Sequence, residues 1–220
     1  MNKAEAIIFD LDGTLYTLDA PDFKSSRLGQ KVKKNIALFL KDKFGDDEVQ
    51  AMARYHEIKE RYGENFSIAI EKGYGIPRSE YFSFTWNIEA AAYVRRVGNV
   101  ARALQSLTVR SGILTAAPRI WADRVLEFLE IKDLIGQAIF TGEPDVRKPS
   151  SLAFQQFVDY WDIPASKIIA IGDQEESDIL PANKLGMTTV RIGNDSTSSA
   201  DFQAPDVIQA LAVLKMVNRI

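Results

Sequence analysis

The sequence predicts an α/β protein with a doubly wound, mainly parallel, Rossmann-like sheet and an inserted all-helical domain. Two observations predict the sheet: short apolar runs that each stop at a polar residue or a glycine, and helical patterns that alternate with these runs in the second half of the chain. Continuous apolar runs suit strands that are buried on both faces, as in parallel sheets. A third observation, a long stretch with helical patterns alone, predicts the insert.

The predicted strands are the apolar runs Ala6–Phe9, Gly112–Leu114, Ala138–Phe140, Ile168–Ile171 and Thr188–Ile192. Between the later strands, two helical faces are formed by Trp121, Val125, Phe128 and Leu129, and by Phe154, Phe157, Val158 and Trp161. This alternation of strand and helix is typical of βαβ units. A last helix is predicted over residues 207–217.

Between the first two strands the apolar spacing predicts about four helices. The stripe of the first is Leu28, Val32, Ile36, Phe39 and Leu40, and that of the second is Ala51, Tyr55, Ile58 and Tyr62. Gly45 and Gly63 are suited to end these helices, a third is expected near Phe66–Lys72, and a fourth begins around Arg78. We therefore expect a core domain of residues 1–15 plus 97–220 and a helical domain of residues 16–96.

Composition excludes several classes of function. The chain of 220 residues has 27 basic and 30 acidic side chains, a net charge of −3, no cysteine and one histidine. Disulfides, thiolate zinc sites and cysteine nucleophiles are therefore excluded, and a zinc hydrolase is disfavoured. The charge gives no global attraction to nucleic acid polymers or anionic membranes. The N-terminal apolar run is too short for a signal peptide or a membrane helix, so we expect a soluble cytoplasmic protein.

Chemically useful side chains follow the predicted strands. Asp10 and Asp12 come after the first, Thr115 after the second and Asp173 after the fourth, while Lys148 precedes the fourth. In an open parallel sheet, ligands bind outside the carboxyl ends of the strands. Clustered carboxylates repel one another unless a cation is present, and ligands that are all oxygen suit Mg²⁺. Lys148 and Thr115 would suit an anion such as a phosphoryl group.

Each of these features also has a simpler reading. Asp-Gly is a common turn dipeptide, and a threonine that ends a strand is often just a buried hydroxyl. Asp178, five residues after Asp173, could be a helix N-cap as well as a further acidic member of the site. The order of all these residues along the chain favours the functional interpretation.

The motifs resemble those of the haloacid dehalogenase superfamily of phosphohydrolases. The matching segments are Asp10–Leu15, Ile113–Thr115, Lys148–Pro149 and Gly172–Asp173 with Asp178. The resemblance implies a Mg²⁺-dependent phosphatase for a small phosphorylated metabolite, with the helical insert as a cap of the first type. It also disfavours a dehalogenase, because those members carry Tyr where this chain has Asp12. The family often has Asn where Ala116 stands, so no polar substrate contact is expected there.

The same resemblance implies a role for each motif residue. Asp10 would attack phosphorus and Asp12 would be the general acid and base. The Asp10 carboxylate, the Asp12 backbone carbonyl and Asp173 would hold the metal, and Thr115 and Lys148 would bind the phosphoryl oxygens.

A weaker likeness to pyrimidine 5′-nucleotidase-like members suggests substrate or cap contacts. It rests on Leu15-Tyr16 and on the stretch 62–65, and it makes Tyr16, Tyr62 and Asn65 the candidates.

Two other functions use the same residues. A phosphomutase would return the phosphoryl group to a sugar phosphate instead of to water. A non-enzymatic phospho-accepting regulator, like a response-regulator receiver, also combines Asp, Thr, Lys and Mg²⁺ on a doubly wound sheet. Receivers lack an insert, and their acceptor aspartate follows a middle strand, so the phosphatase is favoured.

Overall fold

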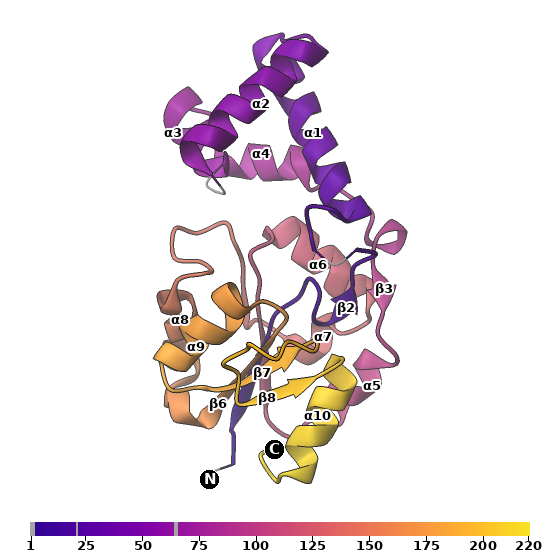
Figure 1. Cartoon of the computed structure of the whole chain (residues 1–220), viewed down its shortest axis with the longest axis vertical. Coiled ribbons are helices and arrows are strands. Elements are labelled where there is room, and N and C mark those ends of the chain that lie inside the picture. Colours follow the sequence, from indigo (N-terminus) through magenta and orange to yellow (C-terminus); the bar gives the residue numbers. More distant parts are fainter. Residues whose placement is uncertain (1–2, 21, 64–65) are drawn as a thin grey trace. The chain divides into compact units, whose positions relative to one another are not determined.

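The computed structural model describes residues 3–20, 22–63 and 66–220. Contacts within the chain divide it into two compact units (Figure 1). The first unit combines Met1–Thr17 with Val94–Ile220 and holds the large sheet, and the second unit is Leu18–Tyr93, which is helical. No helix in the described ranges is long and apolar enough to cross a membrane.

The first unit is built on a six-stranded sheet in the order β5-β4-β1-β6-β7-β8, in which every neighbouring pair is parallel. The strands are β1 (Ala6–Phe9), β4 (Arg110–Leu114), β5 (Ile139–Phe140), β6 (Ile168–Gly172), β7 (Thr188–Ile192) and β8 (Phe202–Ala204). The predicted fold class is confirmed, and all five apolar runs form strands. The order places β1 between β4 and β6, where its four residues are all buried.

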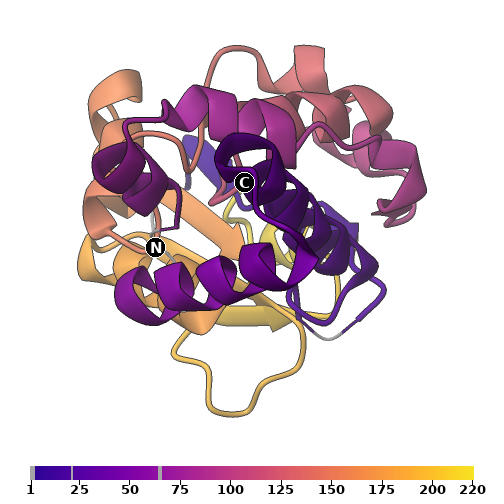
Figure 2. The ribbon, with the colours of Figure 1, turned by 90° about the horizontal axis from the view of Figure 1, so that it is seen from above.

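Helices flank this sheet. They are α5 (Val100–Gln105), α6 (Arg119–Phe128), α7 (Lys132–Ile135), α8 (Ser151–Trp161), α9 (Leu180–Lys184) and α10 (Val207–Met216), with a 3-10 turn at Ala165–Lys167 and a π-helical turn at Glu175–Ile179. The face of α8 predicted from the sequence packs on the sheet, with Phe154 and Phe157 in a buried cluster with Ile8 and Leu114. The loop between β7 and β8 extends away from the sheet (Figure 2).

A short antiparallel pair joins the two ends of the insert. β2 (Tyr16–Thr17) pairs with β3 (Arg95–Arg96), with Tyr16 opposite Arg96. These four residues belong to the first unit, so the helical unit runs from Leu18 to Tyr93, a little shorter than the 16–96 expected from the sequence. The hydrogen-bonded pair is the physical reason, because it joins the two ends of the insert to each other before the helical unit begins.

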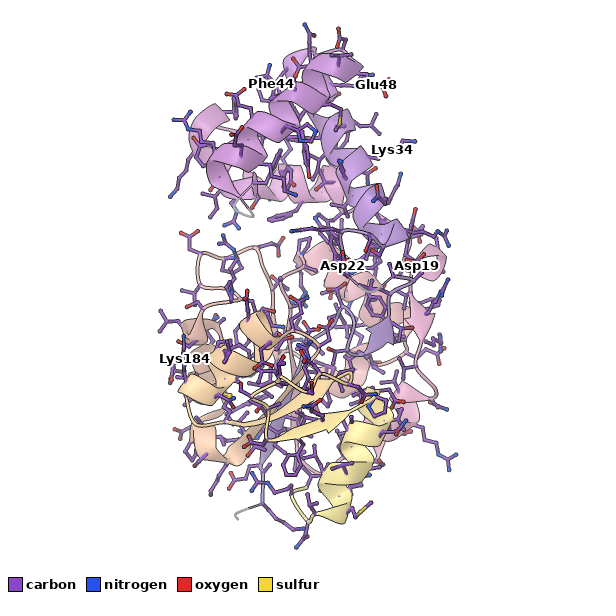
Figure 3. All side chains as sticks on the ribbon, in the orientation of Figure 1. Asp19, Asp22, Lys34, Phe44, Glu48 and Lys184 are labelled. Carbon is purple, nitrogen blue, oxygen red and sulfur yellow. The ribbon has the colours of Figure 1, made fainter. Side chains whose placement is uncertain are left out.

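The second unit contains α1 (Arg27–Phe44), α2 (Glu48–Tyr62), α3 (Phe66–Tyr74) and α4 (Arg78–Thr85), with a 3-10 turn at Ala90–Ala92. The Ser26 side chain caps α1 by accepting from the Gly29 amide, and Asp19, which Figure 3 labels, accepts from the Arg27 amide. Gly45, in the left-handed conformation, follows α1, and Gly63 follows α2, as the sequence predicted.

Gly112 explains how closely β4 and α8 approach. A Cβ atom at Gly112 would lie 2.4 Å from Cε1 of Phe157 and 3.0 Å from the Ala138 carbonyl oxygen. Both neighbours are buried in the same core, so neither can easily move away. The strand can pass over α8 at this point only without a side chain.

We therefore predict that Gly112→Ala lowers the free energy of unfolding of the sheet-bearing unit by about 1–3 kcal/mol, the usual cost of overpacking a core. Denaturant titration measures this. Ser111→Ala, one residue earlier on the same strand, is the control and adds no atoms. Equal free energies of unfolding for Gly112→Ala and the wild type would contradict the proposed tight contact.

Candidate active site

The predicted site residues meet at one edge of the sheet. Asp10, Thr115 and Asp173 directly follow β1, β4 and β6, which are adjacent and parallel. The register pairs Phe9 with both Ile113 and Ile171, so the three strands end nearly level. Asp10 therefore reaches the same place as two side chains that are each more than 100 residues away in the sequence. This is the carboxyl edge at which ligands bind to open parallel sheets.

Lys148 forms the central ion pairs of this edge. Its Nζ lies 2.6 Å from Oδ1 of Asp10 and 2.6 Å from Oδ1 of Asp178, and its side chain is only 3% exposed. Burial on its own would lower the pKa of the Lys148 amine, but the two carboxylates outweigh burial and raise it. Lys148 is therefore charged at neutral pH, and its ion pair places Asp178 beside Asp10.

The acidic side chains outnumber the buried cation. Carboxylate oxygens of Asp10, Asp173 and Asp178 lie within 4.8 Å of one another. Burial, opposed in part by Lys148, raises the pKa of Asp10 well above its usual value. Burial, and then the charge of Asp178, raises the pKa of Asp173 to about 7.

Two oxygens of this acidic cluster, Oδ2 of Asp10 and Oδ1 of Asp173, are buried without a hydrogen-bond partner among the described residues. Buried polar atoms usually have such a partner. A divalent cation would satisfy both atoms and remove the carboxylate repulsion, so these residues fit a metal site with oxygen ligands.

Gly13 lets the chain pass tightly beside this cluster. Its φ of 90° lies in the left-handed region, and a Cβ atom there would lie 2.4 Å from Oδ2 of Asp173. Only glycine satisfies both conditions without strain. The glycine of the first motif therefore allows Asp12 and Asp173 to share one site.

Asp12 has surroundings quite different from those of Asp10. Its Oδ1 accepts hydrogen bonds from the hydroxyl of Tyr16 and, at 2.8 Å, from Nε1 of Trp121. Its Oδ2 accepts from Oγ1 of Thr115 at 3.1 Å. Burial raises the pKa of Asp12, although all three donors oppose the rise. Burial and the Asp12 charge also raise the pKa of the Tyr16 phenol, so this hydroxyl stays protonated and remains a donor.

Thr115 uses its hydroxyl in two contacts. It donates to Asp12 and accepts from the Ala117 amide at 3.0 Å. A hydroxyl donates one hydrogen bond, so Thr115 could donate to a phosphoryl oxygen only in place of Asp12. Phosphate binding by Thr115 stays a prediction.

The sequence analysis missed the contact of Trp121 with this site and the role of Glu143 at the start of the helix that carries Trp121. Trp121 was predicted as core, and it is fully buried, but its indole N–H bonds Asp12. Glu143 accepts from the amide of Arg119 at 3.0 Å and from the Thr141 hydroxyl at 3.1 Å. It thereby caps α6, whose N-cap Pro118 makes no side-chain cap bond. The one signal in the sequence concerned Trp121, because a buried indole N–H usually finds a hydrogen-bond acceptor.

The three candidates for substrate or cap contacts fall in different places. Tyr16 is fully buried in the sheet-bearing unit beside Asp12. Tyr62 is the last residue of α2 in the helical unit and is 38% exposed. Asn65 lies outside the described residues. Tyr16 thus has a contact, to Asp12, that the sequence did not predict.

Comparison with known proteins gives a consistent result. The family model of haloacid dehalogenase-like hydrolases matches residues 4–186. The chain is 28% identical over 228 residues to a ribulose-1,5-bisphosphate 5-phosphatase of Halopiger xanaduensis, with 92% of each chain covered. It is 24% identical over 239 residues to a glyceraldehyde 3-phosphate phosphatase of Pyrococcus furiosus, with 99% of this chain and 96% of the relative covered.

The fold is also shared with a solved structure. A phosphatase of the same family from Thermococcus onnurineus superposes with a TM-score of 0.68 at 19% identity, with 97% of this chain and 98% of the other covered.

The acidic cluster generates a prediction about pH. The pKa of Asp173 rises from 3.8 to about 7 on folding, so between these values the folded protein holds a proton that the unfolded chain has lost. The metal-free protein is therefore expected to lose stability as the pH rises from about 4 to about 7. In EDTA at pH 7.5, Asp173→Asn should have a higher Tm than the wild type, and the two should converge near pH 4.

The same experiment with Mg²⁺ tests the metal site. Because the metal needs ionised carboxylates, millimolar Mg²⁺ should raise the Tm of the wild type most at pH 7.5 and that of Asp173→Asn much less. A wild type that is as stable as Asp173→Asn in EDTA at pH 7.5, with no response to Mg²⁺, would contradict both the buried charge and the metal site.

Proposed function

The chain belongs to the haloacid dehalogenase-like hydrolases, and we propose that it is a Mg²⁺-dependent phosphatase that hydrolyses a small phosphorylated sugar through an aspartyl phosphate on Asp10. The observation that carries this proposal is the contrast between two neighbouring aspartates. Asp10 is ion-paired with Lys148 within an acidic cluster, and Asp12 is held by neutral donors. Such a pair can divide the work of nucleophile and general acid.

The Asp10 carboxylate, the Asp12 backbone carbonyl and Asp173 are the proposed ligands of the metal. The unpartnered oxygens of Asp10 and Asp173 support this assignment, and a donor set made only of oxygen suits Mg²⁺. When bound, Mg²⁺ supplies charge neutralisation and orientation of the transferring phosphoryl group.

Asp10 is the proposed nucleophile. Lys148 holds its Oδ1 at 2.6 Å, which fixes the orientation of the carboxylate, and Asp178 holds Lys148 from the other side. The ammonium group also offsets the repulsion between the Asp10 carboxylate and an anionic ester. Attack of an Asp10 oxygen on phosphorus forms the acyl phosphate as the ester oxygen leaves. Lys148 and Thr115 are the proposed contacts to the phosphoryl oxygens.

Asp12 is the proposed general acid and base. In the first step it gives its proton to the departing ester oxygen. In the second step the same carboxylate takes a proton from the water that attacks the phosphorus. The bond between phosphorus and the Asp10 oxygen then breaks, inorganic phosphate leaves, and both aspartates return to their starting state. Its burial and its three hydrogen bonds keep it in a fixed position beside Asp10.

The relatives suggest the class of substrate. Two of them are named for the hydrolysis of glyceraldehyde 3-phosphate and ribulose 1,5-bisphosphate, so we propose a triose or pentose phosphate here.

The unit Leu18–Tyr93 is the proposed cap domain that selects among such substrates, with exposed Tyr62 as a contact. Tyr62→Ala should then change the ranking of substrates, and an unchanged ranking over a broad panel would contradict the cap assignment.

Hydrolysis is tested with a panel of triose, pentose and hexose phosphates, nucleoside monophosphates and p-nitrophenyl phosphate. We expect phosphate release from sugar phosphates with Mg²⁺ and none after EDTA and dialysis.

Asp10→Asn, which keeps the shape but removes the nucleophilic charge, should reduce turnover to background with a folded circular-dichroism spectrum. Asp133→Asn, an exposed carboxylate on α7, is the control. Turnover by Asp10→Asn at the wild-type rate would exclude covalent catalysis by this residue.

The role of Asp12 is tested by the leaving group. A sugar alkoxide needs a proton as it departs and nitrophenolate hardly does, and general acid–base assistance is worth about 10² to 10⁴ in rate. Asp12→Asn should therefore slow attack on a sugar phosphate strongly and attack on p-nitrophenyl phosphate much less.

Hydrolysis of the acyl phosphate should stay slow with either substrate, because no base remains. Rapid-quench kinetics should then show a nitrophenol burst, and mass spectrometry should show phosphate held on Asp10. Equal slowing of both substrates with no phosphorylated protein would assign Asp12 a structural role instead.

A further inference from the structure

We propose that Tyr16 and Trp121 are positioning residues that hold Oδ1 of Asp12, so that Oδ2 is the oxygen that carries the transferred proton. This inference rests on the proposed function, because it concerns the proton that Asp12 delivers. It assigns roles to two buried side chains that belong to none of the four sequence motifs, and it names one oxygen of the carboxylate.

The two donors reach Asp12 from separate parts of the fold. Tyr16 lies on β2, four residues after Asp12, and Trp121 lies on α6, 109 residues after it. Both side chains are fully buried. Their polar groups end on the same oxygen, Oδ1, whereas Oδ2 receives only the Thr115 hydroxyl among the described residues. The carboxylate therefore has two unequal oxygens.

The different partners of the two Asp12 oxygens determine which oxygen can carry a proton. A carboxylate oxygen accepts along two lone-pair directions, and both directions at Oδ1 are taken by donors. The indole N–H is a donor that cannot accept, so a proton on Oδ1 would displace a buried donor and leave it without a partner, which is costly. Oδ2 has one direction free, and its neighbour Thr115 is a hydroxyl that can rotate. Protonation at Oδ2 keeps every buried donor satisfied.

Both donors are attached to fixed backbone. The ladder of β2 with β3 pairs Tyr16 with Arg96. Trp121 lies in the first turn of α6, where the Glu143 carboxylate caps the Arg119 amide. Complete burial leaves neither side chain a surface for substrate, and a site held by rigid elements keeps its geometry better than one on loops. The contact with Asp12 is therefore the function that the structure gives these polar groups.

Tyr16→Phe and Trp121→Phe test the proposal, with Tyr160→Phe and Trp161→Phe as matched controls. The controls remove the same atoms from α8 in the same unit, where Tyr160 is exposed and Trp161 is buried. The first-turnover rates of Asp10 phosphorylation are measured by rapid quench, with a sugar phosphate and with p-nitrophenyl phosphate as phosphoryl donors.

We expect both test variants to slow phosphorylation by the sugar phosphate on the order of tenfold, a part of the 10² to 10⁴ available to general acids. The rate with p-nitrophenyl phosphate and the KM should change little. Equal slowing with both esters, or slowing no greater than in the controls, would overturn the proposal.

A double-mutant cycle separates positioning from general support of the fold. If Tyr16 acts through the proton of Asp12, then Tyr16→Phe should cause no further loss in an Asp12→Asn background. An undiminished loss in that background would overturn the proposal.

A crystal structure of Tyr16→Phe, which keeps the ring and is the milder change, should show the Asp12 carboxylate rotated from its wild-type orientation. An unmoved carboxylate would also count against it.

Failure of the inference and failure of the proposed function are distinguishable. A wild type that hydrolyses no ester of the panel would overturn both. A wild type that is active, with a leaving-group effect in Asp12→Asn but none in Tyr16→Phe and Trp121→Phe, would overturn the inference alone.

Discussion

The burial of three carboxylates around a single ammonium group is the constraint on which the rest of this site depends. Lys148 forms ion pairs with Asp10 and Asp178 that have almost no exposure to water, and a carboxylate oxygen of Asp173 lies within 4.8 Å of theirs. Removing charges from water costs several kcal/mol for each ion unless partners compensate, and one lysine cannot compensate three carboxylates. The structure thus stores an excess of negative charge that favours the binding of a divalent cation. The sheet order brings the charges together, and Gly13 leaves room for them.

The division of labour that we propose for Asp10 and Asp12 follows from what surrounds each of them. The two residues are separated by only Leu11, yet the first faces a cation and other carboxylates, while the second faces a phenol, an indole and a hydroxyl. Lys148 favours the ionised form of Asp10 against the burial that raises its pKa, and burial favours the protonated form of Asp12 against its three neutral donors. Two chemically identical side chains thereby have different surroundings, because alternate residues of one short segment contact different elements of the fold.

Much of this arrangement could be predicted from the sequence, because it depends on local patterns. The apolar runs gave five strands of the sheet, and the residues that follow them gave Asp10, Thr115 and Asp173. What was missed depends on three-dimensional neighbours. Trp121 fits an apolar helix stripe equally well with or without a partner for its N–H, and that partner is 109 residues away. Glu143 caps α6 only because two loops meet. The strand β8 has three residues, too few for an apolar pattern.

The anchoring of Asp12 also bears on whether this protein stores a phosphoryl group or releases it. A phospho-accepting regulator needs an acceptor aspartate, a cation and a lysine, and a long-lived acyl phosphate is its purpose. A second carboxylate held rigidly beside the acceptor would shorten that lifetime, because it would deprotonate the attacking water. Here three donors from β2, α6 and the end of β4 converge on such a carboxylate. An arrangement that three separate segments build is difficult to reconcile with storage, and it favours turnover.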